Sequence, residues 1–580
     1  MSLRFTTGCS EYSPISGDKT ESKMIGADLI AGILKKEGVE YIPAFPHSDI
    51  IDSGAKIGIV PLIVRQERHS LHIADGYTRM HGGRKVCCTT VQYGPGSENA
   101  VGAVAQCYAD NVPVLHMPGG YARADQGIAP NFNGARNMQL VNKWCEMVLQ
   151  ADRIPQMMQN AFAMMKNGRP GPVTLEIPID IFTEEVDPAL LDSYKVQRRS
   201  APHADPADIS EMADILLAAK NPVIIAGQGI LYAEAWDELV ALAELTDTPV
   251  ISTLNGKSCF PEDHPLSVGC AGGARPDGVN RALERADVYI GLGTSFTTSD
   301  YITPFPKANR TFVQLTNWEG DISKDYPIDL GVIGDAKPSI AALVEAVKAK
   351  TDGKGVDRPE VIETVAAEKQ AFLDKWMPML TSDEQPISPY RVVWDLMNTV
   401  DRSKTVMTHE AGSPRDQTTP FWESIVPHGY MGWGKTTQLG MSLGLMQGAK
   451  LAKPDWTCVH VMGDAAIGMT GMDFETAVRL KLGTITIILK NSIMGGYTKH
   501  HPNASEKYQI EALGGDYAAM AEAFGGYAET ITDPADLIPA YKRAIEKADQ
   551  GIPVLLQIIT KEELRMAKDL PEGVGPHVQV

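Results

Sequence analysis

The chain has 580 residues, of which 43% are hydrophobic and 22% are charged, an ordinary composition for a globular protein. At about 100–200 residues per domain, this length predicts roughly three to five domains with sizeable cores. The formal net charge is −19 at pH 7 and no basic block interrupts it, which argues against nucleic acid or an anionic membrane as a main partner.

The cysteines and the apolar segments indicate the cellular setting. None of the eight cysteines forms a C-x-x-C pair, which predicts buried free thiols in a reducing compartment and no zinc site. No stretch of about 18 apolar residues occurs, so we expect no membrane span. Residues 1–23 are polar and lack the apolar core of a secretory signal. We interpret them as an N-terminal extension and expect a cytoplasmic protein.

Most of the chain alternates β-branched runs with amphipathic helical patterns, which is typical of parallel α/β layers. A first domain is predicted over residues 24–195. It begins with apolar residues at helical spacing in 24–39, and KVCCTTV (85–91), VPVLHM (112–117) and RPGPVTLEIPID (169–180) indicate buried strands. Residues 183–206 are polar and punctuated by proline, which predicts a linker.

Two further domains follow the same pattern. The second is predicted over residues 196–370, with strands in NPVIIAGQGI (221–230), VYIGLGTS (288–295) and TFVQLT (311–316). The third is predicted over 371–565, and its strands lie in 405–412, 456–465, 484–492 and 553–560. Residues 566–580 form a C-terminal tail. We therefore predict an α/β protein with three doubly wound parallel-sheet domains.

The stretch VMGDAAIGMTGMDFE (461–475) carries the first chemical signal. Asp464 directly follows an apolar strand, where open parallel sheets bind ligands. The small residues after Asp464 leave backbone amides free to approach an anion. An acid beside such amides is explained by Mg²⁺ held between the carboxylate and a phosphate. Asn491 ends the next strand, and with the carbonyl of Ile493 it would complete the protein ligands.

GDAAIGMTGMDFETAVRLKLGTITIILKNS (463–492) resembles the diphosphate-binding motif of thiamine-diphosphate enzymes, in the acetolactate synthase and pyruvate decarboxylase superfamily. The resemblance implies thiamine diphosphate and Mg²⁺ as cofactors. It makes the three domains pyrimidine-binding, central and diphosphate-binding, in chain order. The implied metal ligands are Asp464, Asn491 and Ile493, and the implied diphosphate contacts include Gly463, Ala465 and Ala466.

Two segments of the first domain extend the resemblance. VRQERHSLHIADGYTRMHGG (64–83) is similar to the segment with the catalytic glutamate, which implies that Glu67 activates the aminopyrimidine ring and so promotes formation of the C2 ylid. Gln66 replaces the histidine that is common before that glutamate. QYGPGSENAVGAVAQCYADNVPVLHMPGG (92–120) is similar to the next family segment. It implies a tight turn at Gly94 and Pro95, and Asn99 on the helix beside the pyrimidine pocket.

Two segments of the third domain supply further parts. EAGSPRD (410–416) follows a strand, and the resemblance assigns Gly412 and Ser413 to the diphosphate. YMGWGKTTQLGMSLG (430–444) resembles the loop whose large apolar side chain bends the cofactor into a V. Leu439 falls at that position, although a register shift to Met431 or Met441 stays open.

The resemblance leaves the reaction open. We expect decarboxylation or carboligation of a small 2-oxo acid, acetolactate synthase-like, through an ylid and an enamine. Locally, GDAAIGMTGMDFET and EAGSPRD also resemble oxalyl-CoA decarboxylase and 2-hydroxyacyl-CoA lyase. The alternative is therefore a lyase or decarboxylase acting on an acyl-CoA or a 2-hydroxy ketone. A dinucleotide-binding oxidoreductase is a distant alternative, because neither AGQGI nor GLGTS reads G-x-G-x-x-G.

The remaining predictions concern the substrate contacts, the ligand of the central domain and the assembly. Candidate substrate contacts are His116, which is equally well explained as a core histidine, and Phe132, Asn133 and Tyr497 on loops. FAD or ADP in the central domain is possible, although Asn317 replaces the acid that relatives use for the ribose. The resemblance implies a homodimer or a dimer of dimers, with each site between the first domain of one chain and the third domain of another.

Overall fold

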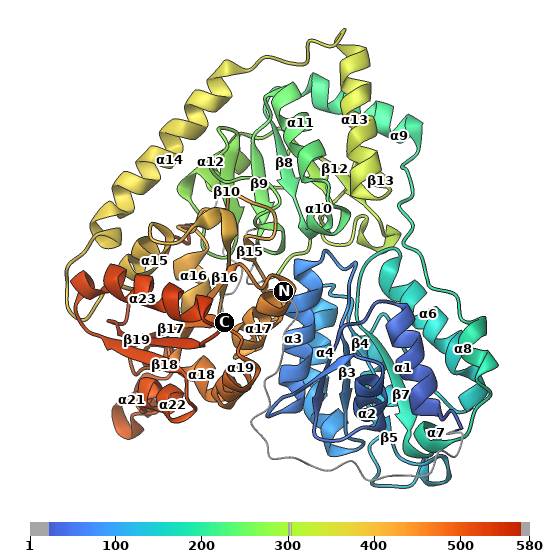
Figure 1. The fold of residues 1–580 in the computed structure, drawn as a ribbon. Coiled ribbons are helices and arrows are strands. Elements are labelled where there is room, and N and C mark those ends of the chain that lie inside the picture. The colour runs from blue at the N-terminus through green and yellow to red at the C-terminus, as the bar shows by residue number, and fades with distance from the viewer. Residues whose placement is uncertain (1–22, 300–301, 303, 570–580) are drawn as a thin grey trace.

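The computed structural model describes residues 23–299, 302 and 304–569. The predicted N-terminal extension and most of the C-terminal tail lie outside the described residues. Three parallel sheets, each covered by helices on both faces, lie at the corners of a triangle (Figure 1). The prediction of an α/β protein with three doubly wound parallel-sheet domains is confirmed.

The first domain is built on a seven-stranded sheet in the order β2-β1-β3-β4-β7-β5, with β6 beside β7. Helix α1 buries one apolar face, including Leu29, Ile30 and Ile33, in the core that packs against the sheet. The strands are β1 Tyr41–Phe45, β2 Val60–Ile63, β3 Cys88–Val91, β4 Leu115–His116, β5 Gly119–Gly120, β6 Trp144–Met147 and β7 Val173–Pro178. The helices are α1 Gly26–Lys36, α2 Asp49–Lys56, α3 Glu67–Met80, α4 Pro95–Ala109, α5 Gly134–Met138, α6 Ile154–Lys166, α7 Ile179–Thr183 and α8 Ala189–Ser193.

The central domain has a six-stranded sheet in the order β10-β9-β8-β11-β12-β13. Asp205 and Pro206 begin its first helix, because the Asp205 carboxylate accepts from Ala207 N at 2.8 Å and proline suits the first helical position. The strands are β8 Pro222–Ala226, β9 Val250–Thr253, β10 Ser267–Ala271, β11 Val288–Leu292, β12 Thr311–Thr316 and β13 Leu330–Ile333. The helices are α9 Pro206–Ala218, α10 Gln228–Ala233, α11 Trp236–Thr246, α12 Asp277–Arg285 and α13 Ala336–Lys350.

The long helix α14 (Pro359–Leu380) runs along the outside of the molecule from the central domain to the third (Figure 1). The third sheet has the order β15-β14-β16-β17-β19-β18. Its strands are β14 Thr405–His409, β15 Tyr430–Met431, β16 Thr457–Gly463, β17 Thr484–Lys490, β18 Tyr527–Ile531 and β19 Val554–Ile559. Its helices are α15 Pro389–Met397, α16 Ser413–Thr418, α17 Met441–Ala452, α18 Asp464–Thr470, α19 Phe474–Leu480, α20 Tyr497–His500, α21 Pro502–Tyr508, α22 Tyr517–Ala523 and α23 Leu537–Asp549.

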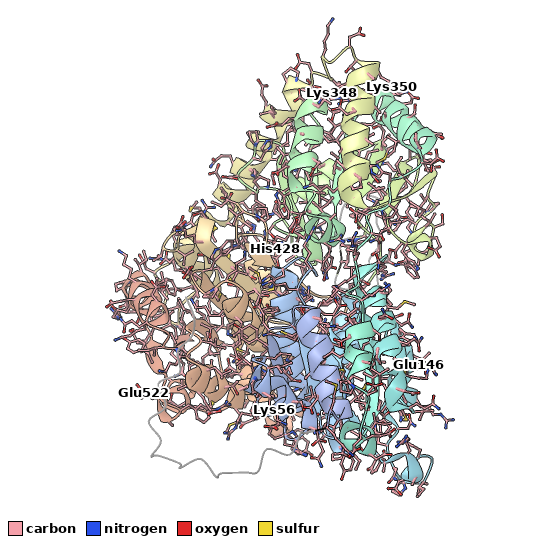
Figure 2. All side chains as sticks on the ribbon, turned by 45° about the vertical axis from the view of Figure 1, so that its right-hand side comes forward. Lys56, Glu146, Lys348, Lys350, His428 and Glu522 are labelled. Atoms are coloured by element: carbon pink, nitrogen blue, oxygen red, sulfur yellow. The ribbon has the colours of Figure 1, made fainter. Side chains whose placement is uncertain are left out.

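The first and third domains meet where α3 crosses α17. Glycines permit this close approach, since a Cβ on Gly76 would lie 2.1 Å from the Leu445 carbonyl oxygen, and one on Gly448 would lie 2.1 Å from that of Ile73. The three domains also meet around His428, whose ring lies 5.9 Å from that of Trp236 on α11 (Figure 2). Lys348 and Lys350, by contrast, project from the outer end of α13 (Figure 2).

Two expectations concern the whole chain. Seven cysteines lie among the described residues, and all seven are buried and free, as predicted for them; Cys9 lies outside the described residues. Over the same residues, none of the helices has the length and the apolar character needed to cross a bilayer.

Candidate functional site

Each sheet contains a point at which its strand order reverses, and open α/β sheets bind ligands beyond the carboxyl ends of the strands at such a point. In the third sheet, the chain leaves β14 for β15 on one side and returns to β16 on the other. Gly412 follows β14, Asp464 follows β16 and Asn491 follows β17. The predicted diphosphate and metal residues of this domain therefore share one edge of one sheet.

Close approaches between their residues show that these three loops lie together. A Cβ on Gly463 would lie 3.9 Å from Pro414 Cγ, and a Cβ on Gly495 would lie 3.5 Å from Ser413 Oγ. Ser492 N donates to Asp464 Oδ2 at 2.8 Å. Gly412 has a φ of 78°, a conformation that disfavours any residue with a Cβ. The loops thus form one surface at the strand ends.

Asp464 has the character of a cation ligand. Its side chain is buried, and while Oδ2 accepts from Ser492 N, the buried Oδ1 has no hydrogen-bond partner. Burial raises the pKa of Asp464, and the bond from Ser492 N opposes that shift. An orphaned carboxylate oxygen is costly, and a bound cation would satisfy it. Asn491 Oδ1 lies in the adjoining turn and accepts from Ile493 N at 3.0 Å.

This donor set fits Mg²⁺, which takes oxygen ligands and usually only one or two carboxylates. For such an ion, Asp464 would supply a carboxylate oxygen, Asn491 an amide oxygen and Ile493 a carbonyl. Within the described residues, no group of three His, Cys, Asp or Glu side chains gathers to hold a metal. A site with a single carboxylate is consistent with that result.

Leu439 lies between the loops that follow β14 and β16. It is half-buried and packs against two apolar clusters, one containing Ala411 and the other Ala466. The next residue, Gly440, has a φ of 88°, and a Cβ there would lie 2.8 Å from Thr470 Oγ1. The alternatives Met431 and Met441 are 4% and 0% exposed, so Leu439 is the most accessible of the three side chains.

In the first domain, the structure joins Glu67 to Asn99. Glu67 begins α3 and is 7% exposed, and its Oε2 accepts from Asn99 Nδ2 at 3.1 Å. Asn99 lies on α4, which Gly94 and Pro95 begin, and Gly94 has a φ of 66°. Gln66 Nε2 donates to Met469 O at 3.1 Å, so α3 begins beside the far end of α18 in the same chain.

The four substrate candidates lie on three separate segments of the chain. His116, on β4, is 0% exposed, bonds Thr89 Oγ1 through Nδ1 at 2.8 Å, and has its pKa lowered to about 3 by burial. These are the surroundings of a core histidine. Phe132 is half-buried, and Asn133 accepts from Arg136 N at 2.8 Å to cap α5. Tyr497 is half-buried and begins α20.

Three family models match the chain in order. They describe the N-terminal TPP binding domain, the central domain and the C-terminal TPP binding domain of thiamine pyrophosphate enzymes, at residues 24–143, 209–343 and 410–558. The chain belongs to the thiamine pyrophosphate enzymes. The family predicted from the sequence motifs is confirmed, and with it thiamine diphosphate as the cofactor of the two flanking domains.

The relatives of this thiamine pyrophosphate enzyme extend over nearly its full length. A probable acetolactate synthase large subunit of Methanocaldococcus jannaschii is 29% identical over 558 residues, which cover 92% of each chain. An acetolactate synthase large subunit of Corynebacterium glutamicum is 28% identical, covering 93% of this chain and 86% of its own. A glyoxylate carboligase of Escherichia coli is 26% identical, covering 93% of each.

The sequence analysis of this thiamine pyrophosphate enzyme missed one acid beside the loops predicted to bind the diphosphate. Glu410 directly follows β14, two residues before Gly412, and is 0% exposed. Its carboxylate accepts from Ala411 N at 2.9 Å, Ser442 N at 3.2 Å and Ser442 Oγ at 2.7 Å. Burial raises the pKa of Glu410 to about 7. The sequence contained a sign of this residue, since the motif EAGSPRD begins with Glu410 at the end of a predicted strand.

Two cavities lie at the strand-order reversals of the other sheets. One, of about 550 Å³, lies beyond β1 and β3 and is lined by His47, Ser48 and Tyr93, which the sequence analysis did not select. The other, of about 120 Å³, lies beyond β8 and β11. Both GxG turns reach the second cavity, and its lining includes Arg169, Lys435 and Asn317.

Proposed function

We propose that the protein is a thiamine-diphosphate- and Mg²⁺-dependent carboligase or decarboxylase of a small 2-oxo acid, acetolactate synthase-like. One observation carries the proposal: an orphaned, buried carboxylate oxygen of Asp464 beside Asn491, at the strand-order reversal of the third sheet. The relatives named acetolactate synthase and glyoxylate carboligase, each similar over nearly the full chain, support carboligation.

The third domain would hold the cofactor by its diphosphate. Mg²⁺ would bind Asp464 Oδ1, Asn491 Oδ1 and the carbonyl of Ile493, since these are oxygen donors on adjoining loops. Its charge would also offset the desolvation that raises the pKa of Asp464. Leu439 would support the rings from below. The proposed diphosphate contacts are Gly412, Ser413, Gly463, Ala465 and Ala466.

The first domain would activate the cofactor. When bound, thiamine diphosphate supplies a carbon nucleophile and holds the electron pair of the bond that is cleaved. Glu67 would hold a proton against the aminopyrimidine ring through Oε1, because Asn99 Nδ2 already occupies Oε2. Gly94 and Pro95 would place the start of α4, and with it Asn99, beside that ring. This role makes Glu67 the proposed catalytic residue.

We propose an assembly in which a second chain completes each site, as a homodimer or a dimer of dimers. Two exposed methionines support this assembly. Met469, near the end of α18, is 48% exposed and its carbonyl accepts from Gln66, and Met472, in the turn that follows α18, is 51% exposed. Apolar side chains exposed at the rim of a predicted site are often covered by a partner. Light scattering after size-exclusion chromatography measures the oligomeric state.

The central cavity is the proposed place for FAD or ADP if the protein carries either. Arg169 and Lys435 give it positive charge, and burial lowers the pKa of Lys435 to about 8. An anionic ligand there would raise the pKa of Lys435 again. The visible spectrum of the purified protein, followed by nucleotide analysis after denaturation, decides between flavin, ADP and neither.

The reaction is tested by one anaerobic incubation of purified protein with thiamine diphosphate, Mg²⁺ and pyruvate, with glyoxylate in a parallel sample. Release of CO₂ with a carboligation product supports the proposal. If the cofactor binds and neither 2-oxo acid yields CO₂, the reaction class is wrong. The alternative, cleavage of an acyl-CoA or a 2-hydroxy ketone, would then be assayed with the same protein.

A further inference from the structure

The turn that presents Leu439 is preceded by an irregular loop, residues 432–438, between β15 and α17. Its start is held by its own domain, where Trp433 Nε1 donates to His409 O at 3.0 Å. A Cβ on Gly432 would lie 1.7 Å from the Leu254 carbonyl oxygen, so the loop presses against the central domain. Ordering such a segment costs conformational entropy, and other contacts must hold it in place.

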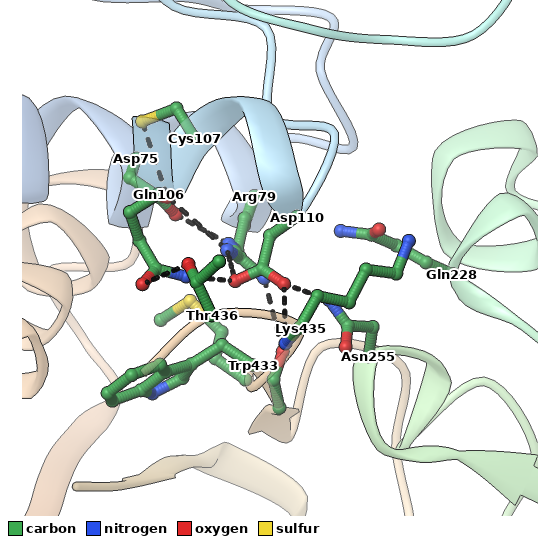
Figure 3. Close-up of polar contacts among 12 residues, drawn as sticks. Asp75, Arg79, Gln106, Cys107, Asp110, Gln228, Asn255, Trp433, Lys435 and Thr436 are labelled. Carbon is green, nitrogen blue, oxygen red and sulfur yellow. Dashed lines mark hydrogen bonds and ion pairs between the residues drawn. The ribbon is translucent and has the colours of Figure 1, made fainter. Parts of the chain in front are cut away.

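Gln106 on α4 of the first domain supplies two of these contacts, and Figure 3 shows the one with Thr436. Its Oε1 accepts from Thr436 Oγ1 at 2.9 Å and from Gln438 N at 3.1 Å. Gln106 is 1% exposed, and its Nε2 donates to Asp110 Oδ2 at 2.7 Å, which fixes the amide orientation. Both loop contacts lie within three residues of Leu439.

Arg79 and Asp110 hold the earlier half of the loop. Arg79 Nη1 donates to Gly432 O at 3.1 Å, and Lys435 N donates to Asp110 Oδ1 at 3.4 Å. Arg79 is itself fixed by Asp75, with Nε and Oδ1 2.5 Å apart. Arg79 and Asp110 are 6% and 0% exposed. Water is therefore largely excluded from these bonds, and buried groups of this kind need protein partners.

The same carboxylate reaches the central domain. Asn255 Nδ2 donates to Asp110 Oδ1 at 2.9 Å, and the side chain of Lys435 extends toward Gln228 at the central cavity (Figure 3). One buried carboxylate thus contacts groups of all three domains. Residues of the first domain fix this junction, although the loop they hold belongs to the third.

We propose that Gln106, Asp110 and Arg79 are positioning residues that set the height of Leu439 beneath the cofactor. This inference rests on the proposed function, because it assigns Leu439 to the floor of the thiamine-diphosphate site. The first domain would thereby contribute to cofactor affinity twice, through Glu67 at the ring and through Gln106 behind the supporting turn.

Thr436→Val is the decisive variant, because it removes one bond to Gln106 and keeps the β-branched shape. Thr436→Ser, which retains the hydroxyl, is the rescue variant. Thr364→Val is the matched control, since the Thr364 hydroxyl donates to the Glu360 carbonyl at 2.7 Å on α14, away from the loop. Gln106→Leu removes both bonds but also disturbs the core, so it serves only as a second variant.

The measurement is a thermal-shift titration of each protein with thiamine diphosphate at saturating Mg²⁺. We expect Thr436→Val to bind about fivefold more weakly, which corresponds to a net hydrogen bond of about 1 kcal/mol. Thr436→Ser should bind within twofold of the wild type, and the melting temperatures without cofactor should agree within the set. The substrate KM should not change, because none of the proposed substrate contacts lies on this loop.

Two negative results are distinguishable. If the wild type binds thiamine diphosphate and Thr436→Val matches Thr364→Val, the positioning role is wrong and the proposed function stands. If the wild type does not bind thiamine diphosphate with Mg²⁺, the proposed function fails and this inference fails with it.

Discussion

Replacing Glu410 by glutamine tests how the protein holds a buried carboxyl group beside the cofactor loops. Glu410 is 0% exposed and receives three hydrogen bonds, from Ala411 N and from both the amide and the hydroxyl of Ser442. Burial outweighs those bonds and raises the pKa of Glu410 from 4.5 to about 7. A glutamine side chain has nearly the same shape as glutamate, and its amide does not titrate in this pH range.

The magnitude follows from the two pKa values. Between pH 4.5 and 7 the folded chain keeps a proton on Glu410 that the unfolded chain has released. In that window the free energy of unfolding falls by about 1.4 kcal/mol per pH unit. The difference 7 − 4.5 = 2.5 units gives a total of about 3 kcal/mol. This stability is fully present below pH 4.5 and is lost as the pH rises through 7.

Scanning calorimetry of wild type and Glu410→Gln from pH 4.5 to 8 measures this loss. In a domain of about 150–250 residues, 1 kcal/mol shifts the melting temperature by about 2–4 °C. We expect the wild-type melting temperature, relative to that of the variant, to fall by about 6–12 °C over the range. Other titrating groups are common to both proteins and cancel.

A control and a contrary result complete the test. Ser442→Ala removes the hydroxyl that donates to Glu410 at 2.7 Å, and it should move the transition to higher pH because the charged form loses a donor. A difference between wild type and Glu410→Gln that stays constant from pH 4.5 to 8 would show that Glu410 does not bind a proton in this range.

Three further variants test the proposed site. Asp464→Ala should lose Mg²⁺-dependent binding of thiamine diphosphate in isothermal titration calorimetry, and unchanged binding would remove Asp464 from the metal site. Glu67→Gln should lower kcat by about 10²–10⁴-fold while cofactor affinity stays within about threefold, and full activity would refute the activation role. Leu439→Ala should destabilise the third domain by about 1–2 kcal/mol in urea unfolding and weaken cofactor binding. Met431→Leu is a volume-conserving control and should change the cofactor affinity little. If Leu439→Ala and Met431→Leu bind the cofactor with equal affinity, the supporting role returns to the alternative register at Met431 or Met441.

The strand ends were the part of the site that sequence could predict. Asp464 and Asn491 each follow an apolar strand. Parallel pairing of β16 with β17 brings the residues after both strands to the same edge of the sheet, independently of how the helices pack. The contact between Glu67 and Asn99 has the same origin, because each residue lies near the start of a helix that follows a strand of the first sheet.

Contacts that depend on packing between elements could not be predicted in the same way. Glu410 is adjacent in sequence to residues that were selected, but its burial depends on α17 covering it, which no local pattern encodes. VPVLHM (112–117) reads as a strand of six residues, yet β4 is only Leu115–His116, since Pro113 has no amide to donate to a neighbouring strand. The bonds of Asp110 to Asn255 and Lys435 join residues of three domains, far apart in the chain.

All three sheets are parallel and each contains a strand-order reversal, but their strand orders differ, and so does what each reversal point presents. The third presents a buried Asp464 oxygen, Oδ1, that has no hydrogen-bond partner. The first presents a cavity, with Glu67 on the helix that follows the edge strand β2, and the central domain presents a cavity beside Lys435. No single domain carries every proposed part. The loop at 432–438 contacts the first and central domains before it reaches Leu439. Affinity for the cofactor should therefore depend on how the domains dock, and residues remote from the cofactor, such as Gln106, become part of what the site requires.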